Sequence, residues 1–364
     1  MGMKALVIPP ETTAPPPHGG LASQWQPYPT PACPPQGALL HVAGCGLCGT
    51  DVDKLLKGRR PATGVLGHEV VGTIIELAPD VDAALGWHVG QRIMVAHHIP
   101  CGECHYCLNA SPSMCRAFKA SNIAPGGYAE TIALSGQHLA HTTFAIPSHI
   151  SWREASCIEP LACVVRAVDK CPTAKGQATA AVIGLGFIGQ LAGQVFGLRG
   201  YQTLGLDVNP KRVALANVMQ SVACATIPQE ASLQAFLDAT PTSGVDVVCL
   251  TVVNAAAIAQ ALALVREGGT LLIVAGPPTA EQGQLCADTL YHREVSVVTS
   301  YSPSLASLQQ AAQWIFERKV AVTPLITHPM PIEAFDEGVL LYRQGEAMKV
   351  FYEMVSPYVP VVPT

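Results

Sequence analysis

A thiol, an imidazole and a carboxylate occur close together near the start of the chain, in two short stretches that contain glycine. Cys48 lies in residues 46–51, and His68 and Glu69 follow twenty residues later. These side-chain types can hold a catalytic Zn²⁺ ion while one position stays open for a substrate. Thr50 places a hydroxyl two residues from the cysteine, where it could take a proton from a bound alcohol. On these residues alone, a chance neighbourhood of a buried cysteine and a histidine is an equally good interpretation.

Four more cysteines form a second group with a different spacing. They follow the pattern C-x₂-C-x₂-C-x₇-C at Cys101, Cys104, Cys107 and Cys115. Four thiolates can close a tetrahedron around zinc and leave no open position, so we predict a structural zinc in a lobe of about residues 97–118. Free or disulfide-bonded cysteines are disfavoured, because three cysteines at two-residue gaps suit a metal better. His97 and His98, just upstream, are interpreted as ordinary histidines at a strand end.

A glycine-rich turn follows an expected strand at residues 178–183 and opens an expected helix. Its residues are Gly184, Gly186, Phe187, Ile188 and Gly189. The first glycine permits a tight turn, the second lets the backbone approach a pyrophosphate, and the third lets the helix pack on its strand. Residues 176–198 carry no charge, so a membrane span is the alternative. The order of strand, glycines and helix favours a dinucleotide site.

An acidic residue ends the next expected strand, at residues 202–206. This residue, Asp207, comes eighteen residues after Gly189. A carboxylate in this place can accept hydrogen bonds from both ribose hydroxyls and repels a 2′-phosphate, which favours NAD over NADP. Arg212 could offset that repulsion, so NADP stays open as the less favoured cofactor.

A second carboxylate stands at the boundary between two regions of different pattern. Ser151 and Glu154 form a capping box that predicts a helix to about residue 168, bent or interrupted by Pro160. Glu159 lies beside that irregularity. On local grounds, a surface glutamate in a kinked helix is as good an interpretation as a functional carboxylate.

The elements that must position these residues change in character along the chain. Residues 1–150 predict short strands and loops, with a proline-dense loop or irregular edge at residues 9–35. Expected strands there lie at residues 4–8, 38–42, 70–77 and 90–95. From residue 178, strands alternate with helices, and a helix, the strand-like residues 325–327 and a final helix follow residue 302. The glycine pair at residues 268–269 is expected to mark the end of one of these helices. The chain is therefore expected to be an α/β protein of at least two domains.

Bulk composition excludes several classes of function. The 364 residues carry a formal net charge of −5, which gives no basic patch for nucleic acid. The cysteine count is 13, an odd number, and no charged, apolar leader precedes the first strand. We therefore expect reduced cysteines in a cytoplasmic protein with no membrane or nucleic-acid partner.

Taken in order, these motifs resemble those of the zinc-dependent medium-chain alcohol dehydrogenases, in the branch of sorbitol (polyol) and threonine dehydrogenases. The resemblance rests on residues 3–6, 46–51, 67–69, 101–115, 126–130, 159–161, 184–189 and 325–328. It implies a partly open GroES-like β-barrel catalytic domain at residues 1–158. A Rossmann domain with a doubly wound parallel sheet would follow at residues 159–300, and residues 301–364 would return to the first domain.

The resemblance also implies roles for individual residues. Cys48 and His68 would bind the catalytic zinc, and either Glu69 or Glu159 would supply the fourth ligand or hold the zinc's water. The family commonly has a proton-relaying histidine where this chain has Asp53, so the resemblance does not identify the residue that relays the proton. Two zinc ions per chain are expected.

The glutamate at position 159 favours a polyol, sugar alcohol or cyclitol over ethanol as substrate, with threonine as the alternative. Zinc would lower the pKa of the substrate hydroxyl and NAD would accept a hydride. Related enzymes are often homodimers or homotetramers. A non-catalytic zinc- and nucleotide-binding relative is the alternative of another class.

Overall fold

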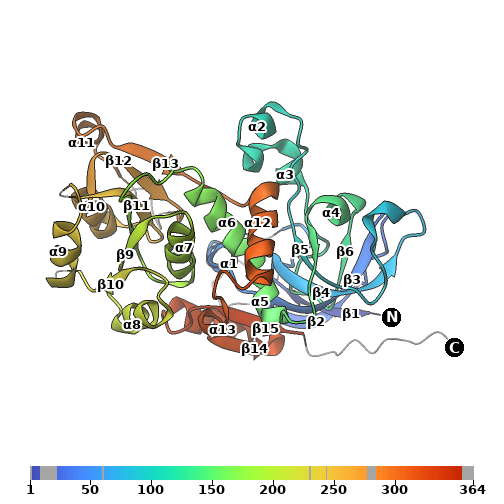
Figure 1. The fold of residues 1–364 in the computed structure, drawn as a ribbon. Coiled ribbons are helices and arrows are strands. Elements are labelled where there is room, and N and C mark those ends of the chain that lie inside the picture. Colours follow the sequence, from blue (N-terminus) through green and yellow to red (C-terminus); the bar gives the residue numbers. More distant parts are fainter. Residues whose placement is uncertain are drawn as a thin grey trace. The chain divides into compact units, whose positions relative to one another are not determined.

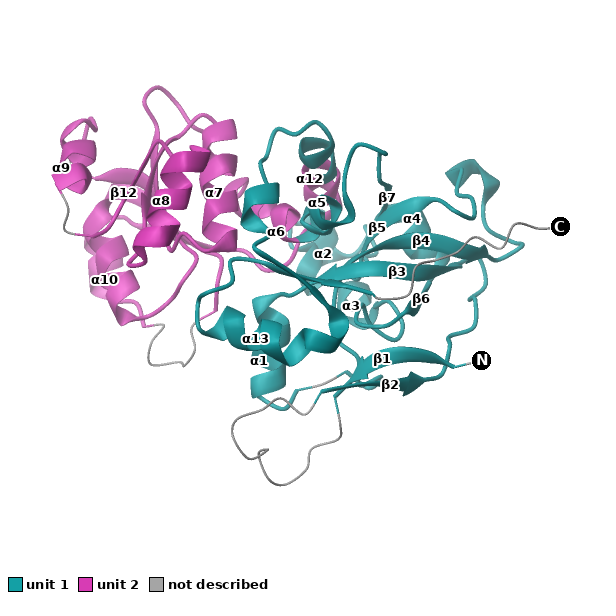
Figure 2. Cartoon of the chain, turned by 90° about the horizontal axis from the view of Figure 1, so that it is seen from below, with its two compact units in different colours: residues 1–159, 312–364 teal, residues 160–311 magenta. Residues whose placement is uncertain are grey.

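The structure is a computed structural model that describes residues 2–8, 23–59, 61–228, 231–242, 244–276 and 284–354. Its contacts divide the chain into two compact units (Figure 2). Unit 1 comprises residues 1–159 and 312–364, and unit 2 comprises residues 160–311. The proline-rich tail from residue 357 lies outside the described residues. Among the described residues, no helix is both long and apolar enough to span a membrane.

Unit 1 is built on a mixed sheet, which has seven strands in the described part of the chain. The order is β14-β15-β3-β4-β5-β7, and β6 pairs with β3. A separate antiparallel pair is formed by β1 and β2. The bounds are β1 Met3–Val7, β2 Gln24–Tyr28, β3 Ala38–Gly46, β4 Glu69–Leu77, β5 Arg92–Ala96, β6 Thr131–Leu134, β7 Thr143–Ala145, β14 His328–Pro331 and β15 Val350–Glu353.

The register of β3 and β4 places two distant stretches side by side. The strands run antiparallel, with Gly46 opposite Glu69 and Cys45 opposite Val70. Residues just after β3 and just before β4 therefore meet at one end of this pair. The first stretch contains Cys48, and the second contains His68.

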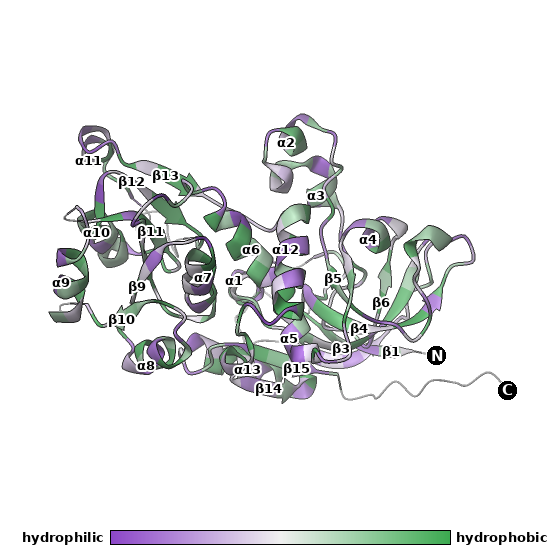
Figure 3. Cartoon of the chain, in the orientation of Figure 1, coloured by the Kyte–Doolittle hydropathy of each residue, from purple (hydrophilic) through white to green (hydrophobic). Residues whose placement is uncertain are grey.

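Apolar side chains fill the interior of unit 1. They come from facing strands and include Leu40, Ile74, Ile93 and Ile132, all fully buried. Hydrophobic residues run through the sheets of both units (green in Figure 3). Short helices surround the sheet of unit 1. Their bounds are α1 Gly49–Leu56, α2 His105–Leu108, α3 Arg116–Ala120, α4 Gly136–His141, α5 Trp152–Ser156 and α13 Phe335–Arg343.

Unit 2 is a parallel sheet with helices between its strands (Figure 1). The strand order is β10-β9-β8-β11-β12-β13, and all its pairs are parallel. The order reverses between β8 and β11, as in doubly wound dinucleotide-binding sheets. The strands are β8 Thr179–Ile183, β9 Gln202–Leu206, β10 Cys224–Thr226, β11 Val245–Leu250, β12 Val265–Ile273 and β13 Ser296–Thr299. Its helices are α7 Phe187–Leu198, α8 Pro210–Met219, α9 Ala231–Asp238, α10 Ala255–Leu264 and α11 Ala287–His292. Two further helices, α6 Ile158–Val168 and α12 Leu305–Phe316, cross the boundaries between the units.

The proline-dense residues 9–35, expected to form a loop or an irregular edge, contain β2, an edge strand of a two-stranded sheet; residues 9–22 lie outside the described part. Two other sequence predictions were wrong in detail. The glycine pair at residues 268–269, expected to end a helix, lies inside β12. Residues 323–325 form a 3₁₀ turn, and the strand begins at His328. Pairing with another strand decides the structure of β12 and of the strand at His328, and local propensity does not report it.

The helix expected over residues 151–168 is broken at a different place. It is divided into α5 and α6 at Cys157, and not at Pro160. Pro160 lies in the first turn of α6, where the missing backbone N–H has no helical partner to lose. The predicted capping box is present, since Ser151 Oγ accepts a hydrogen bond from the Glu154 N–H and the Glu154 carboxylate accepts one from the Ser151 N–H.

Glu154 is expected to stabilise unit 1 in a pH-dependent way. Burial opposes its charge, but hydrogen bonds from Ser151 and Thr323 and the charge of Arg318 lower the pKa of Glu154. Because this pKa lies below that of the unfolded chain, the stabilisation is complete above the unfolded value and is lost as the pH falls through the folded one. We expect Glu154→Gln to lower Tm near neutral pH by about 3 °C. The difference in Tm between Glu154→Gln and the wild type should become smaller below about pH 4.

The matched control is Glu353→Gln. Glu353 pairs with Arg153, but both side chains are nearly half exposed, so its loss should leave Tm almost unchanged. Thermal unfolding followed by circular dichroism at several pH values measures both variants. A Glu154→Gln deficit that stays constant from neutral pH to acid would contradict this assignment.

Candidate active site

Three potential metal ligands converge where β3 ends and β4 begins. One ligand atom each of Cys48, His68 and Glu69 lies within 4.8 Å of the other two. Cys48 caps the N-terminus of α1, and its sulfur accepts a hydrogen bond from the Thr50 N–H at 3.4 Å. A thiolate is the form of cysteine that binds a metal. The cap fixes the position of this sulfur at the start of α1.

A buried carboxylate orients the histidine. Asp51 is fully buried, and its Oδ1 lies 3.3 Å from His68 Nδ1. The other oxygen, Oδ2, accepts a hydrogen bond from the Tyr128 hydroxyl at 2.9 Å. This arrangement leaves His68 Nε2 as the nitrogen that can bind a metal, in the manner of a carboxylate–histidine–zinc triad.

The carboxylate also sets the proton affinity of the histidine. Burial alone would lower the pKa of His68, but Asp51 and Cys48 outweigh it and raise the pKa of His68 well above its usual value. A metal must displace this proton, so metal binding here weakens in acid.

The carboxylate of Glu69 is held by a lysine from the far end of the chain. Lys349 Nζ forms an ion pair with Glu69 Oε2 and donates a hydrogen bond to the Leu47 carbonyl at 2.9 Å. Both side chains are almost completely buried. Gly46 makes room for this carboxylate, because a Cβ at that position would lie 1.9 Å from Glu69 Oε2. The ion pair raises the pKa of Lys349 despite its burial, so this lysine stays charged.

The charges of this cluster fit a divalent cation. A Cys48 thiolate and the carboxylates of Asp51 and Glu69 give three negative charges, and Lys349 gives one positive charge. Buried charge is costly unless it is compensated. When the metal displaces the His68 proton, two negative charges remain, which one Zn²⁺ ion would neutralise. Sulfur, nitrogen and oxygen donors together are also the set used by catalytic zinc sites.

Three other residues expected at this site lie outside the group of three ligands. Thr50 is exposed at the start of α1. Asp53 is about half exposed and forms an ion pair with Lys57 at 2.6 Å. Glu159 is buried in the first turn of α6 and is not one of the three ligands within 4.8 Å of one another.

A row of aromatic rings begins at His68, one of the three potential metal ligands. The rings of His68 and His97 have centroids 4.8 Å apart, and those of His97 and His98 lie 3.8 Å apart. The row ends at Phe118. Burial and the neighbouring His68 and His98 lower the pKa of His97 well below its usual value, so its ring is neutral near neutral pH. His98 Nδ1 faces the Ser121 carbonyl at 2.6 Å.

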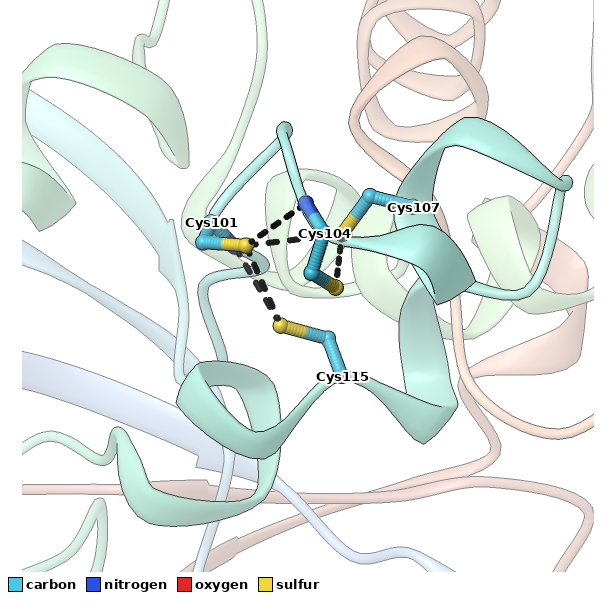
Figure 4. Close-up of side chains that lie close together, drawn as sticks. All are labelled: Cys101, Cys104, Cys107 and Cys115. Atoms are coloured by element: carbon cyan, nitrogen blue, oxygen red, sulfur yellow. Dashed lines mark hydrogen bonds between the residues drawn. The ribbon is translucent and has the colours of Figure 1, made fainter.

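The four cysteines of the predicted lobe point their sulfurs toward one another (Figure 4). The sulfur–sulfur distances are 3.5 Å for Cys104–Cys107, 3.6 Å for Cys101–Cys115 and 3.9 Å for Cys101–Cys107. Sulfurs bound to one zinc at about 2.3 Å would lie about 3.8 Å apart in a tetrahedron. The backbone N–H of Cys101 helps lower the pKa of Cys115 to about 6, which favours a thiolate. The group therefore fits a closed zinc site.

The glycine turn of unit 2 has the geometry that its sequence predicts. Gly184 follows β8 with φ of 93°, a conformation that suits glycine. A Cβ on Gly189 would lie 1.8 Å from the Gly184 carbonyl oxygen, so helix and turn can approach this closely only at a glycine. Gly186 caps α7, and no atom lies within 4 Å of where its Cβ would be. The backbone at this helix N-terminus is therefore open to an anionic group.

Asp207 links the end of β9 to this turn. Its Oδ2 accepts a hydrogen bond from the Leu185 N–H at 2.7 Å, and its Oδ1 accepts one from the Asn209 N–H at 2.8 Å. Arg212 Nη1 lies 3.6 Å from the same carboxylate. A carboxylate fixed in this way keeps lone pairs for further donors, such as ribose hydroxyls.

Sequence reasoning assigned no functional role to four residues that shape these sites: Asp51, His97, Tyr128 and Lys349. Asp51 and Tyr128 stand inside motifs whose other members were noticed. Lys349 had a weak signal, as a lone cation in the apolar residues 347–352. His97 was assigned to a strand end, where it does lie, directly after β5. Its contact with His68 depends on tertiary packing.

We expect mutations in the two groups of potential zinc ligands, one at Cys48 and one at the four clustered cysteines, to have different effects on zinc content and stability. Cys48→Ala should remove one zinc per chain and lower kcat/KM by more than about a hundredfold, with Tm nearly unchanged. Cys104→Ala should remove the other zinc and lower Tm by about 5 °C or more, because metal binding in that lobe is also folding energy. Elemental analysis and thermal unfolding measure both effects. Full zinc content in both variants would refute the two assignments.

Comparison with known proteins identifies two domains in the chain. Residues 34–146 match the family described as alcohol dehydrogenase GroES-like domain, and residues 188–317 match the zinc-binding dehydrogenase family. The structure is similar to a zinc-binding dehydrogenase of Sinorhizobium meliloti bound to NADP, with a TM-score of 0.79 and 24% identity over 97% of this chain and 99% of that one. The predicted fold, a GroES-like domain with a Rossmann domain, is therefore confirmed.

Two curated relatives cover most of the chain. A sorbitol dehydrogenase of Halalkalibacterium halodurans is 31% identical over 96% of this chain and 98% of its own length. An L-threonine 3-dehydrogenase of Bacillus subtilis is 29% identical over 88% of this chain and 92% of its own length. The chain therefore belongs to the zinc-dependent medium-chain alcohol dehydrogenases, in the branch of the sorbitol and threonine dehydrogenases, and is an NAD(P)-dependent alcohol oxidoreductase.

Proposed function

We propose that the protein oxidises a secondary alcohol of a polyol, sugar alcohol or cyclitol to a ketone, with NAD as hydride acceptor. The observation that carries this proposal is the buried carboxylate Glu69 beside Cys48 and His68. A carboxylate makes the metal site harder and richer in oxygen than a second thiolate would. Such a site suits a substrate that offers more than one hydroxyl. The sorbitol dehydrogenase relative supports the same substrate class.

The residues of unit 1 have separate tasks in this reaction. Cys48, His68 and Glu69 would hold the zinc, which lowers the pKa of an alcohol hydroxyl when it is bound. Thr50 would relay the hydroxyl proton: its oxygen takes this proton while its own O–H proton passes to water, which its exposed position allows without a histidine relay. Asp53 is held by Lys57, so it is the weaker candidate for this relay. Glu159 remains the other candidate ligand, through the residues 159–161 that match the polyol branch.

The glycine turn and Asp207 hold the cofactor in unit 2. The N-terminus of α7 receives the pyrophosphate, and the Asp207 carboxylate accepts hydrogen bonds from the ribose hydroxyls. Phe187 and Ile188 start the helix behind this turn, and Gly189 lets it pack closely. Because Asp207 is anionic and almost fully buried, it disfavours a 2′-phosphate.

A second candidate substrate is L-threonine, favoured by the threonine dehydrogenase relative. That substrate needs a cation to hold its carboxylate. The buried cation beside the ligand group, Lys349, is already paired with Glu69. This pairing supports the polyol over the amino acid.

The protein is also proposed to act as a homodimer or homotetramer. Strand β13 is an edge of the unit 2 sheet, and its side chains are mostly exposed. An edge strand of this kind can pair with its copy across a two-fold axis.

Cofactor choice should depend on the charge of Asp207. We expect wild-type kcat/KM to favour NAD over NADP, and Asp207→Ser to narrow that gap by about tenfold or more, because the variant no longer repels a 2′-phosphate. Arg212→Ala is the matched control, and should widen the gap by removing a phosphate partner. Steady-state kinetics with both cofactors measure the ratio. A wild-type preference for NADP would overturn the role of Asp207.

Substrate class can be tested with one plate of NADH-formation assays. The substrates are sorbitol, xylitol, inositols, 2,3-butanediol, L-threonine and ethanol. We expect turnover of at least one polyol at a kcat/KM well above that of ethanol, because the oxygen-rich metal site gains from a second hydroxyl. L-threonine as the best substrate would establish the second candidate. Strong turnover of ethanol without any polyol would refute the polyol class and leave the alcohol dehydrogenase activity intact.

A further inference from the structure

One buried nitrogen beside the metal-binding group has no partner in the described part of the chain. His97 Nδ1 is shielded from solvent and forms no hydrogen bond. The backbone carbonyl of the same residue does have a partner, since it lies 3.1 Å from His138 Nε2. The backbone carbonyl of His97 therefore has a polar partner, whereas its ring nitrogen Nδ1 has none. Buried polar atoms without partners are rare and costly, so this nitrogen needs a functional explanation.

The position of the ring suggests what that explanation is. His97 packs against the ring of His68, with centroids 4.8 Å apart, and His68 is a proposed zinc ligand. The next ring in the row, His98, differs because the Ser121 carbonyl lies 2.6 Å from its Nδ1. Of these two rings, the one with the unsatisfied nitrogen is therefore the one that packs against His68.

A substrate hydroxyl could form the hydrogen bond that His97 Nδ1 lacks. A neutral imidazole nitrogen either donates or accepts one hydrogen bond, and a hydroxyl can do both. In a polyol, the carbon next to the reacting one carries a second hydroxyl, one C–C bond away from the first. A substrate bound through its first hydroxyl at the metal would carry that second hydroxyl into the surroundings of His68. A simple alcohol has only a hydrogen in its place.

We propose that His97 is a specificity-determining residue, whose Nδ1 forms a hydrogen bond with the second hydroxyl of a vicinal diol substrate. This inference rests on the proposed polyol oxidation and extends it to a particular atom. A site that pairs a buried polar group with a substrate hydroxyl discriminates against the analogue that lacks it, because the group is then left unsatisfied. His97 would therefore separate diols from simple alcohols.

Two variants separate hydrogen bonding from packing. His97→Phe keeps an aromatic ring between His68 and His98 and removes the nitrogen. His97→Asn loses the ring but places an amide, which donates and accepts hydrogen bonds, near the position of Nδ1. His98→Phe is the control for loss of an imidazole whose Nδ1 already faces a protein carbonyl. Each is purified with zinc, and its zinc content and Tm are measured first.

The substrates are 2,3-butanediol and 2-butanol, which differ by one hydroxyl. We expect the wild-type ratio of kcat/KM for diol over alcohol to exceed one, and His97→Phe to lower it about tenfold. His97→Asn should recover a large part of that ratio, and His98→Phe should leave it unchanged while lowering Tm. His97→Phe should keep its zinc and melt no lower than wild type, because it removes an unsatisfied buried polar atom.

The outcomes distinguish this inference from the function on which it rests. A wild-type ratio at or below one contradicts the proposed substrate class. A wild-type ratio above one that His97→Phe leaves unchanged overturns the role of His97 and leaves the polyol proposal standing. A His97→Phe enzyme that loses zinc or melts well below wild type would show that the ring has a structural role, which also overturns the inference.

Discussion

The antiparallel pairing of β3 with β4 is the constraint that brings together the three proposed zinc ligands, Cys48, His68 and Glu69. It sets Gly46 opposite Glu69, so the chain leaving β3 and the chain entering β4 meet at the same place. Cys48 follows the first strand and His68 precedes the second. Because side chains alternate between the faces of a sheet, a shift of one residue in this register would turn Glu69 to the opposite face. Gly46 adds to the constraint, since a larger residue would occupy the space of the Glu69 carboxylate.

Charge compensation is the second requirement of this group, and it draws on the whole of unit 1. Three acidic groups are gathered in an interior where uncompensated charge is costly. Lys349, directly before β15, neutralises one of them through Glu69. The Tyr128 hydroxyl donates a hydrogen bond to Asp51, which in turn faces His68. A divalent cation completes the balance, so the sheet positions the ligands while the buried polar groups tune them.

Prediction from sequence succeeded where the information is local. The four cysteines lie within fifteen residues, so their spacing alone brings their sulfurs together. The glycine turn likewise joins a strand to the helix that follows it, and Asp207 ends the next strand. Errors arose where another strand decides the outcome, as for the glycine pair inside β12, which pairs with β11 and β13. Local propensity carries no record of these partners.

The sequence by itself determined the chemical inventory of this protein: two donor sets for zinc, a dinucleotide turn, and the order of strands and helices that supports them. Tertiary structure alone decided which groups surround those donors. Lys349 and Glu69 are separated by 280 positions, and Tyr128 and Asp51 by 77. His97 lies close to His68 only because β5 pairs with β4. Such contacts arise from strand register and burial, which are properties of the folded chain, and no spacing along the sequence encodes them.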